Sequence, residues 1–258
     1  MNIQDEAILR EFNLFPLWVR RDAPLPTNTV TVTIQVNAPT ESFAVKSKVE
    51  TLAIPTVIPG QQEVEPAPEY ANIDAADWPA LKQQVHDCTS CKLRATCTQT
   101  VFGVGDEKAE WMFVGEGPGA DEDAQGEPFV GQAGKLLDNM LASIKLKRGN
   151  NVYIANVVKC RPPNNRTPEP EEVAQCWPYL QRQIALIKPK LIVALGKTAA
   201  TALLGRDATL GSLRGTVHQY QGIPLIITYH PAYLLRSPVE KAKAWQDLCF
   251  AVNVLSAR

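Results

Sequence analysis

The chain has 258 residues, of which 45% are apolar and 21% charged, a composition typical of a globular protein large enough for one good core. It excludes a chain that is disordered throughout, and no window approaches the roughly 18 uninterrupted apolar residues of a membrane span. The net charge of −1 hides an asymmetry, since residues 1–80 hold 5 basic against 11 acidic residues while residues 81–258 hold 21 against 16. A basic body permits nucleic acid as a partner, although such an excess more often marks a solvated face.

The first 80 residues read as a separate, poorly structured extension with its linker. They contain nine of the twenty prolines and only one of the fifteen glycines. The pattern predicts a short amphipathic helix that ends before Pro16, a strand over residues 29–36 and a linker over residues 54–79. The start MNIQDEAILR lacks the basic end and apolar run of a secretory signal, so we expect a cytoplasmic protein.

The remainder, residues 81–258, alternates short apolar runs with amphipathic segments. Strands are predicted at 111–114, 152–157, 191–195 and 224–228, and helices at 133–145, 169–187, 198–204 and 239–255. Nearly all-apolar strands between helices indicate a parallel sheet covered on both faces. The fold class is therefore α/β, a three-layer α/β/α domain around a four-stranded, mainly parallel sheet.

The distinctive motifs follow the carboxyl ends of these strands: GEGPG, NVVKCRPPNNR, GKTAA and YHPAYLLR, in chain order. Open α/β sheets bind ligands along that edge, so one cleft can collect all four. The glycine loop is a poor phosphate site, because Pro118 removes a backbone donor and the neighbouring acids repel an anion. GKTA lacks the upstream glycine of a phosphate loop, since Leu191 stands there. A tight turn is the plainer interpretation, but Phe129 and the acids suit a flat ligand and a positive charge.

Several single residues keep two interpretations on the sequence alone. Asn156 at a strand end either reads a ligand or closes a turn, and His230 is as easily structural as catalytic. The C-x2-C pair Cys88 and Cys91 indicates a metal site, for which zinc is at least an equal choice. Cys97 is the main rival ligand, and a further cysteine, Cys249, is expected to be a buried thiol.

Together these segments closely resemble the family 4 uracil-DNA glycosylases, the iron-sulfur members of that superfamily. The resemblance rests on CTSC, VFGVGDEKAEWMFVGEGPGADED, GEPFVGQAGKLLDNML, VYIANVVKCRPPNNRTPEPEE, VALGKTAA and HPAYLLR, in this order from about residue 87 to the end. It implies a monofunctional enzyme that releases uracil from single- and double-stranded DNA and starts base-excision repair. A monomer is expected.

The resemblance also implies residue roles. Glu116 positions the attacking water and stabilises the cationic sugar, with support from the acids that follow it, and His230 donates to the departing base. The implied sets are, for catalysis, Glu116, His230, Asp121 and Glu122; for uracil binding, Gly117, Phe129 and Asn156; for DNA binding, Arg161, Arg166, Tyr233, Leu234, Leu235 and Arg236. One of the two leucines is expected to wedge into the base stack.

For the metal site, the resemblance implies a [4Fe-4S] cluster held by Cys88, Cys91, Cys160 and Cys176. Its role is expected to be structural, because hydrolysis needs no redox step. The first twenty residues are faintly similar to the psi subunit of the bacterial replicative clamp loader, so the extension is expected to bind a replication or repair protein.

Two other functions stay open on the sequence. One is a non-catalytic, replication-associated DNA-binding module, which would bind DNA and release no base. The other is a relative that traps uracil-DNA covalently. Such relatives carry a histidine after the cluster cysteine, and RPPNNRTPEP has none, which disfavours this alternative.

Overall fold

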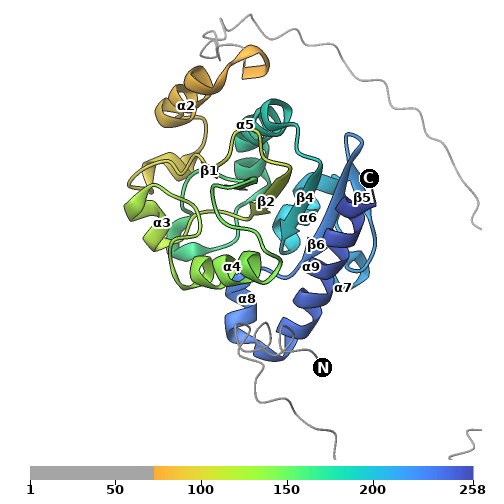
Figure 1. Cartoon of the computed structure of the whole chain (residues 1–258). Coiled ribbons are helices and arrows are strands. Elements are labelled where there is room, and N and C mark those ends of the chain that lie inside the picture. The colour runs from red at the N-terminus through yellow and green to blue at the C-terminus, as the bar shows by residue number, and fades with distance from the viewer. Residues whose placement is uncertain (1–72, 258) are drawn as a thin grey trace, which may run out of the picture. The chain divides into compact units, whose positions relative to one another are not determined.

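The computed structural model describes residues 73–257, and the structural statements below concern that part of the chain. The helix expected before Pro16, the strand over 29–36 and most of the linker lie outside it. The described fold begins with a 3-10 turn, η1 (Ile73–Ala75), and helix α2 (Trp78–Asp87), whose N-cap Asp77 accepts from the Ala80 amide at 3.0 Å (Figure 1). Sequence patterning did not indicate α2.

A six-stranded sheet forms the centre, in the order β1-β3-β2-β4-β6-β5. The four inner strands, all parallel, are those that the sequence predicted: β3 (Val152–Asn156), β2 (Trp111–Gly115), β4 (Leu191–Leu195) and β6 (Ile223–Thr228). Two antiparallel edge strands, β1 (Val104–Gly105) and β5 (His218–Tyr220), were missed. They are too short to carry an alternating pattern.

The predicted helices appear within about two residues of their expected ends as α4 (Gln132–Ser143), α5 (Pro170–Ile187), α6 (Lys197–Leu204) and α9 (Lys241–Ser256). Three short helices come in addition: α3 (Ala120–Gln125), α7 (Leu210–Leu213) and α8 (Pro231–Arg236). Pro178 lies inside α5, and Glu169 caps that helix. A 3-10 turn, η4 (Pro238–Glu240), occupies the expected start of α9.

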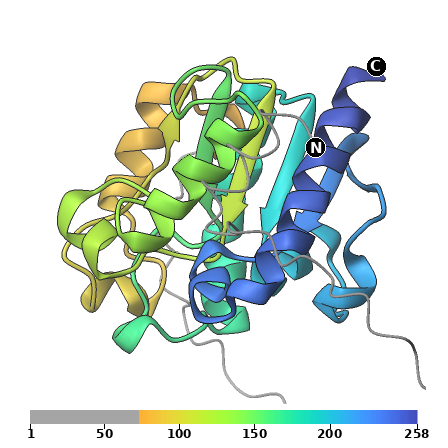
Figure 2. The same ribbon diagram turned by 60° about the horizontal axis from the view of Figure 1, so that its bottom comes forward.

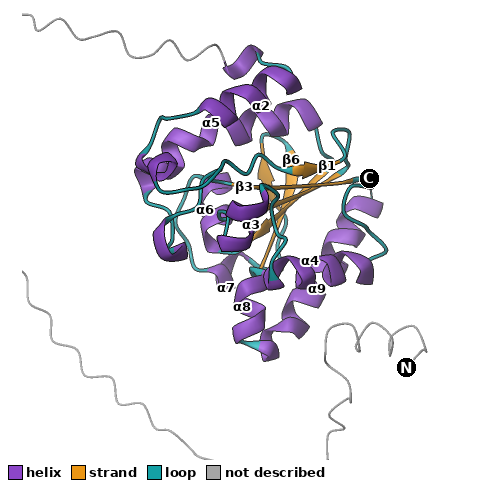
Figure 3. Ribbon diagram, turned by 90° about the vertical axis from the view of Figure 1, so that its left-hand side faces the viewer, coloured by secondary structure: helices purple, strands orange, loops and turns teal. Residues whose placement is uncertain are grey.

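The helices cover both faces of the sheet, as Figure 3 shows. Along β2, Met112 and Val114 face one core with the apolar sides of α2, α5 and α6. Trp111 and Phe113 face the other core, with α4, α8 and α9. Strands buried on both faces read as continuous apolar runs, which explains the sequence pattern and confirms the three-layer α/β fold.

The parallel strands end at one edge. Figure 2 shows β2 and β4 side by side with their arrowheads at the same end. β2, β3, β4 and β6 terminate at Gly115, Asn156, Leu195 and Thr228, so the segments that follow them meet there. Within residues 73–257 no helix has the length and apolar character to cross a membrane.

Candidate active site

A cavity of about 540 Å³ lies at this edge. Loops after β2, β3 and β6 supply its walls. All but three of the non-cysteine residues that the sequence singled out line it, namely Glu116, Gly117, Asp121, Glu122, Phe129, Asn156, Arg166, His230, Tyr233 and Arg236. The exceptions are Arg161, Leu234 and Leu235. Segments more than 100 residues apart in the chain therefore contribute to one cavity, as a parallel sheet edge permits.

Glu116 follows the last residue of β2 directly. One carboxylate oxygen, Oε2, accepts a hydrogen bond from the Thr198 hydroxyl at the start of α6. Its backbone carbonyl accepts from the Val158 amide at 3.2 Å, which ties the loop to the segment after β3. Backbone and side chain are thus both held, with the carboxylate in the cavity wall.

The three acids after Glu116 occupy different environments. Asp121 is exposed and lines the cavity. The Glu122 carboxylate accepts from the Gly119, Val130 and Gly131 amides at 3.0, 2.9 and 3.1 Å. These bonds fold the glycine loop back onto itself. The sequence did not predict this structural role of Glu122.

The third acid, Asp123, is buried and does not line the cavity. Its carboxylate accepts from the Thr98 amide at 2.8 Å, from the Thr98 hydroxyl at 3.0 Å and from the Gln99 amide at 3.3 Å. Burial of a carboxylate requires such partners. Asp123 therefore anchors α3 to the segment after the cysteine pair.

Asn156, the last residue of β3, is 1% exposed. Its amide oxygen is buried and has no hydrogen-bond partner within the described chain. A Cβ at Gly115 would come within 2.4 Å of this oxygen and 2.5 Å of the Phe129 ring, so only glycine fits there. An unpaired buried carbonyl costs about 1–3 kcal/mol, and here it lies in a cavity wall, where a ligand can satisfy it.

Phe129 places its ring beside His230, with centroids 5.4 Å apart and planes 30° apart. Its backbone has a φ of 57°, a left-handed conformation that costs energy in phenylalanine. Arg148 holds it there, because its guanidinium donates to the carbonyls of Pro128 and Phe129 at 2.7 and 2.6 Å. Gly134 completes the fit, since a Cβ there would meet the Phe129 carbonyl oxygen at 1.8 Å. The buried aromatic ring is a rigid wall of the cavity.

His230 caps α8, and its Nδ1 accepts from the Ala232 amide at 3.2 Å. That bond requires a lone pair on Nδ1, so in the neutral ring the proton is on Nε2. Burial lowers the pKa of His230 to about 4, and the nearby Arg236 guanidinium acts in the same direction. The Glu122 carboxylate opposes this shift but does not cancel it. Near neutral pH His230 is therefore an uncharged Nε2–H donor.

The segment after His230 is a helix, and this changes the interpretation of its leucines. Leu234 is fully buried in the core formed with α9, so it does not enter a duplex as the sequence allowed. Leu235 and Tyr233 are 43% and 37% exposed, and Val239 in η4 is 80% exposed. Tyr233 stacks on Tyr229 with centroids 5.1 Å apart. Leu235 is thus the leucine that can reach a base stack.

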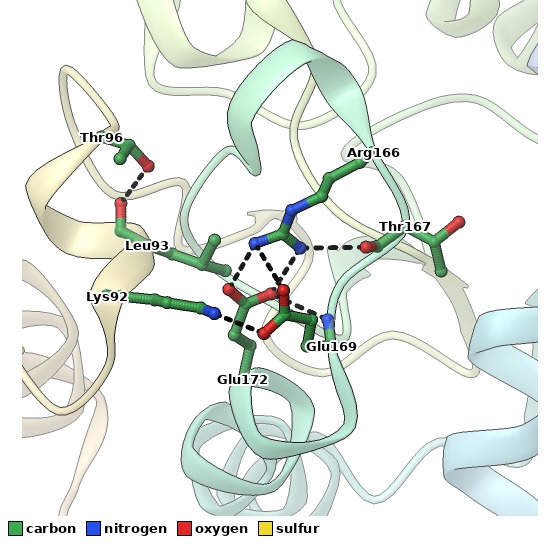
Figure 4. Close-up of polar contacts among 7 residues, drawn as sticks. All are labelled: Lys92, Leu93, Thr96, Arg166, Thr167, Glu169 and Glu172. Carbon is green, nitrogen blue, oxygen red and sulfur yellow. Dashed lines mark hydrogen bonds and ion pairs between the residues drawn. The ribbon is translucent and has the colours of Figure 1, made fainter.

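Two of the three arginines proposed for DNA, Arg161 and Arg166, are engaged within the protein. Arg166 donates to both oxygens of the buried Glu172 at 2.8 and 2.7 Å and to the Thr167 carbonyl at 3.0 Å (Figure 4). This bond holds the pKa of Glu172 below its usual range. Arg161 donates to Asn165 at 2.7 Å. Both arginines order the loop after β3, and a phosphate would have to share Arg166 with Glu172.

The four cysteines Cys88, Cys91, Cys160 and Cys176 line one small pocket, separate from the cavity. Burial raises the pKa of Cys176 to about 12, and burial also raises the pKa of Cys160, next to Cys97. In residues 73–257, no group of three or more His, Cys, Asp or Glu side chains is close enough to hold a metal ion. The sixth cysteine, Cys249, is half-buried in α9, not fully buried as expected.

Comparison with known proteins found relatives that match most of the described chain. The chain is 49% identical over 166 residues to a protein of Archaeoglobus fulgidus named type-4 uracil-DNA glycosylase, a match covering 61% of this chain and 83% of the relative. Proteins of that name from Pyrobaculum aerophilum and Thermotoga maritima are 46% and 44% identical, over 67% and 64% of this chain and 91% and 92% of their own lengths.

The family model described as the uracil DNA glycosylase superfamily matches residues 102–249. This range holds both Glu116 and His230 and every inner strand of the sheet. The chain therefore belongs to the uracil-DNA glycosylase superfamily.

Proposed function

We propose that this protein is a uracil-DNA glycosylase that hydrolyses the N-glycosidic bond of uracil in single- and double-stranded DNA. The product is an abasic site, with which base-excision repair begins. The observation that carries the proposal is one cavity that combines the Glu116 carboxylate, the neutral His230 donor and the unsatisfied Asn156 oxygen. The similarity to type-4 uracil-DNA glycosylases supports the same activity.

Charge development in the reaction matches the two sides of the cavity. As the bond breaks, the deoxyribose becomes cationic and the base anionic. Glu116 faces the sugar in this account, where it stabilises the cation and accepts a proton from the attacking water. Asp121 adds a second carboxylate to the same wall.

The base side carries a donor with no net charge. His230 offers Nε2–H to uracil O2, and the hydrogen bond strengthens as negative charge grows on that oxygen. With a pKa of about 4, the ring carries no extra proton near neutral pH, so His230 acts through the hydrogen bond and not by protonating the base.

Selectivity for uracil comes from Asn156. Its unpartnered oxygen can accept from uracil N3–H, and its amide group can donate to O4. Cytosine reverses both positions and would leave polar groups unpaired in a buried site. The Phe129 ring offers a surface on which the extruded base stacks, and the Gly117 backbone can approach it closely.

The enzyme is proposed to be monofunctional. Within residues 73–257, no lysine lines the cavity. The nearest candidate by sequence, Lys159, is buried behind it and donates to the Asn156 carbonyl at 2.8 Å and to Gln183 at 2.7 Å. With its amine so bonded, Lys159 is not placed to form a Schiff base with the sugar.

Four cysteines that line one pocket can hold either a zinc ion or a [4Fe-4S] cluster. We propose the cluster, as the resemblance of the sequence to the family 4 glycosylases implies. A four-iron cluster binds each of four cysteines through a different iron. Cys88, Cys91, Cys160 and Cys176 would hold it, and it would join α2, the loop after β3 and α5 without taking part in hydrolysis.

Uracil excision is tested with the purified full chain and a labelled oligonucleotide that contains one uracil. We expect strand cleavage only after alkali treatment, in single and double strands alike, and none with a matched thymine oligonucleotide. Glu116→Gln and His230→Gln should abolish most cleavage while DNA binding persists. Binding without any alkali-labile site in the wild type would favour the non-catalytic module instead, and a covalent protein–DNA adduct would favour the trapping alternative.

A further inference from the structure

The turn that opens α6, Gly196–Thr198, lies behind both proposed catalytic side chains. It belongs to the segment VALGKTAA, which the reaction outlined above leaves without a role. The segment resembles the tail of a phosphate loop, but its lysine, Lys197, is exposed and pairs with Asp207 at 2.9 Å. Anion binding therefore does not explain the segment VALGKTAA.

On one side the turn contacts Glu116. Thr198 Oγ1 donates to Glu116 Oε2, a bond between residues 82 positions apart in the chain. A threonine hydroxyl carries one proton, so this bond uses its whole donor capacity on a single carboxylate oxygen. The bond fixes the rotation of the carboxylate and leaves the other oxygen, Oε1, for the cavity.

On the other side the turn contacts His230. Gly196 has a φ of +91°, and a Cβ there would approach the His230 Cβ to 3.0 Å. The Gly196 amide donates to the Thr228 carbonyl at 2.9 Å, which continues the pairing of β4 with β6. The Gly196 backbone therefore packs against His230, and a side chain at residue 196 would be strained by the positive φ and would press on His230.

We propose that Gly196 and Thr198 are positioning residues that set the separation and orientation of Glu116 and His230. This inference rests on the proposed glycosylase function. The turn touches each group from outside the cavity, and neither of its two residues lines it. Its effect is expected on the chemical step and not on binding of the DNA.

The decisive variants are Thr198→Val, which keeps the shape and removes the hydroxyl, and Thr198→Ser, which keeps the hydroxyl. A hydrogen bond to a charged group is worth enough to change a rate about tenfold. We expect Thr198→Val to lower kcat for uracil release about tenfold with KM within about twofold, and Thr198→Ser to stay within about threefold of wild type. Thr201→Val is the matched control, because this hydroxyl lies one turn further along α6 and has no partner in residues 73–257.

A double-mutant cycle separates positioning from general damage. If Thr198 acts through the carboxylate, Thr198→Val has no further effect in a Glu116→Ala background. Gly196→Ala should lower kcat as well, by displacing His230. Equal loss in Thr198→Val and Thr201→Val, or an additive effect in the Glu116→Ala background, would overturn the inference. A wild type that releases no uracil would instead refute the proposed function.

Discussion

Replacing Asn156 with leucine separates recognition of the base from stability of the fold. In the free protein the Asn156 oxygen is buried without a partner in the described chain, at a cost of about 1–3 kcal/mol. Leucine has a similar shape and no polar atom, so we expect the free energy of unfolding to rise by about 1 kcal/mol, or roughly 2–4 °C in Tm. With uracil bound, two polar groups of the base would lose their partners, about 2–6 kcal/mol together, which lowers the excision rate roughly 10²- to 10⁴-fold.

The assay is single-turnover uracil release, alongside thermal unfolding at a fixed scan rate. Gln183→Met is the matched control. Gln183 is an equally buried amide, but it accepts from Lys159 at 2.7 Å and donates to the Phe102 carbonyl at 2.9 Å, so its replacement should lower Tm. An Asn156→Leu variant that excises uracil at the wild-type rate would remove Asn156 from base recognition. One that loses stability as Gln183→Met does would show that the Asn156 oxygen is paired in the free protein.

Three further predictions concern stability, pH and the cysteine pocket. Arg214→Met leaves the buried Asp247 carboxylate without its partner at 2.7 Å. The free energy of unfolding, measured with urea, should fall by about 3 kcal/mol, and adding Asp247→Asn should restore part of it. The pKa of His230 is lowered to about 4, whereas an unfolded histidine titrates near 6.5. Between these pH values the unfolded chain binds one more proton than the folded chain, so the free energy of unfolding falls as the pH drops from about 6.5 to 4. His230→Gln should flatten this dependence. Cys160→Ser should remove the brown absorbance expected of the proposed [4Fe-4S] cluster and lower Tm, while Cys97→Ser keeps both; an unchanged spectrum in Cys160→Ser would remove Cys160 from the proposed ligands.

The sheet and its ligand-binding edge were predictable because their signals are local. The inner strands are continuous apolar runs, and each ends where a glycine, amide or imidazole motif begins. Parallel strands then bring Glu116, Asn156 and His230 to one edge whatever the details of packing. Topology therefore predicts that these residues share one cavity, which they line.

What could not be predicted depends on contacts between distant segments. Leu234 and Leu235 are adjacent in the sequence, and the packing of α8 on the core that it shares with α4 and α9 decides that Leu234 is buried and Leu235 exposed. Arg166 looked free for phosphate until the fold of its loop brought it onto Glu172. Thr198 reaches Glu116 across 82 positions, and no pattern near either residue indicates that bond.

In the proposed reaction a carboxylate faces the sugar and an uncharged imidazole faces the base within one cavity. A crystal structure of the Glu116→Gln variant with a uracil-containing oligonucleotide tests this placement. We predict that the uracil is flipped into the cavity, with its O2 within hydrogen-bond distance of His230 Nε2 and its N3–O4 edge on Asn156. A base bound outside the cavity, or one whose O2 faces residue 116 instead of His230, would rule out this placement of the charges.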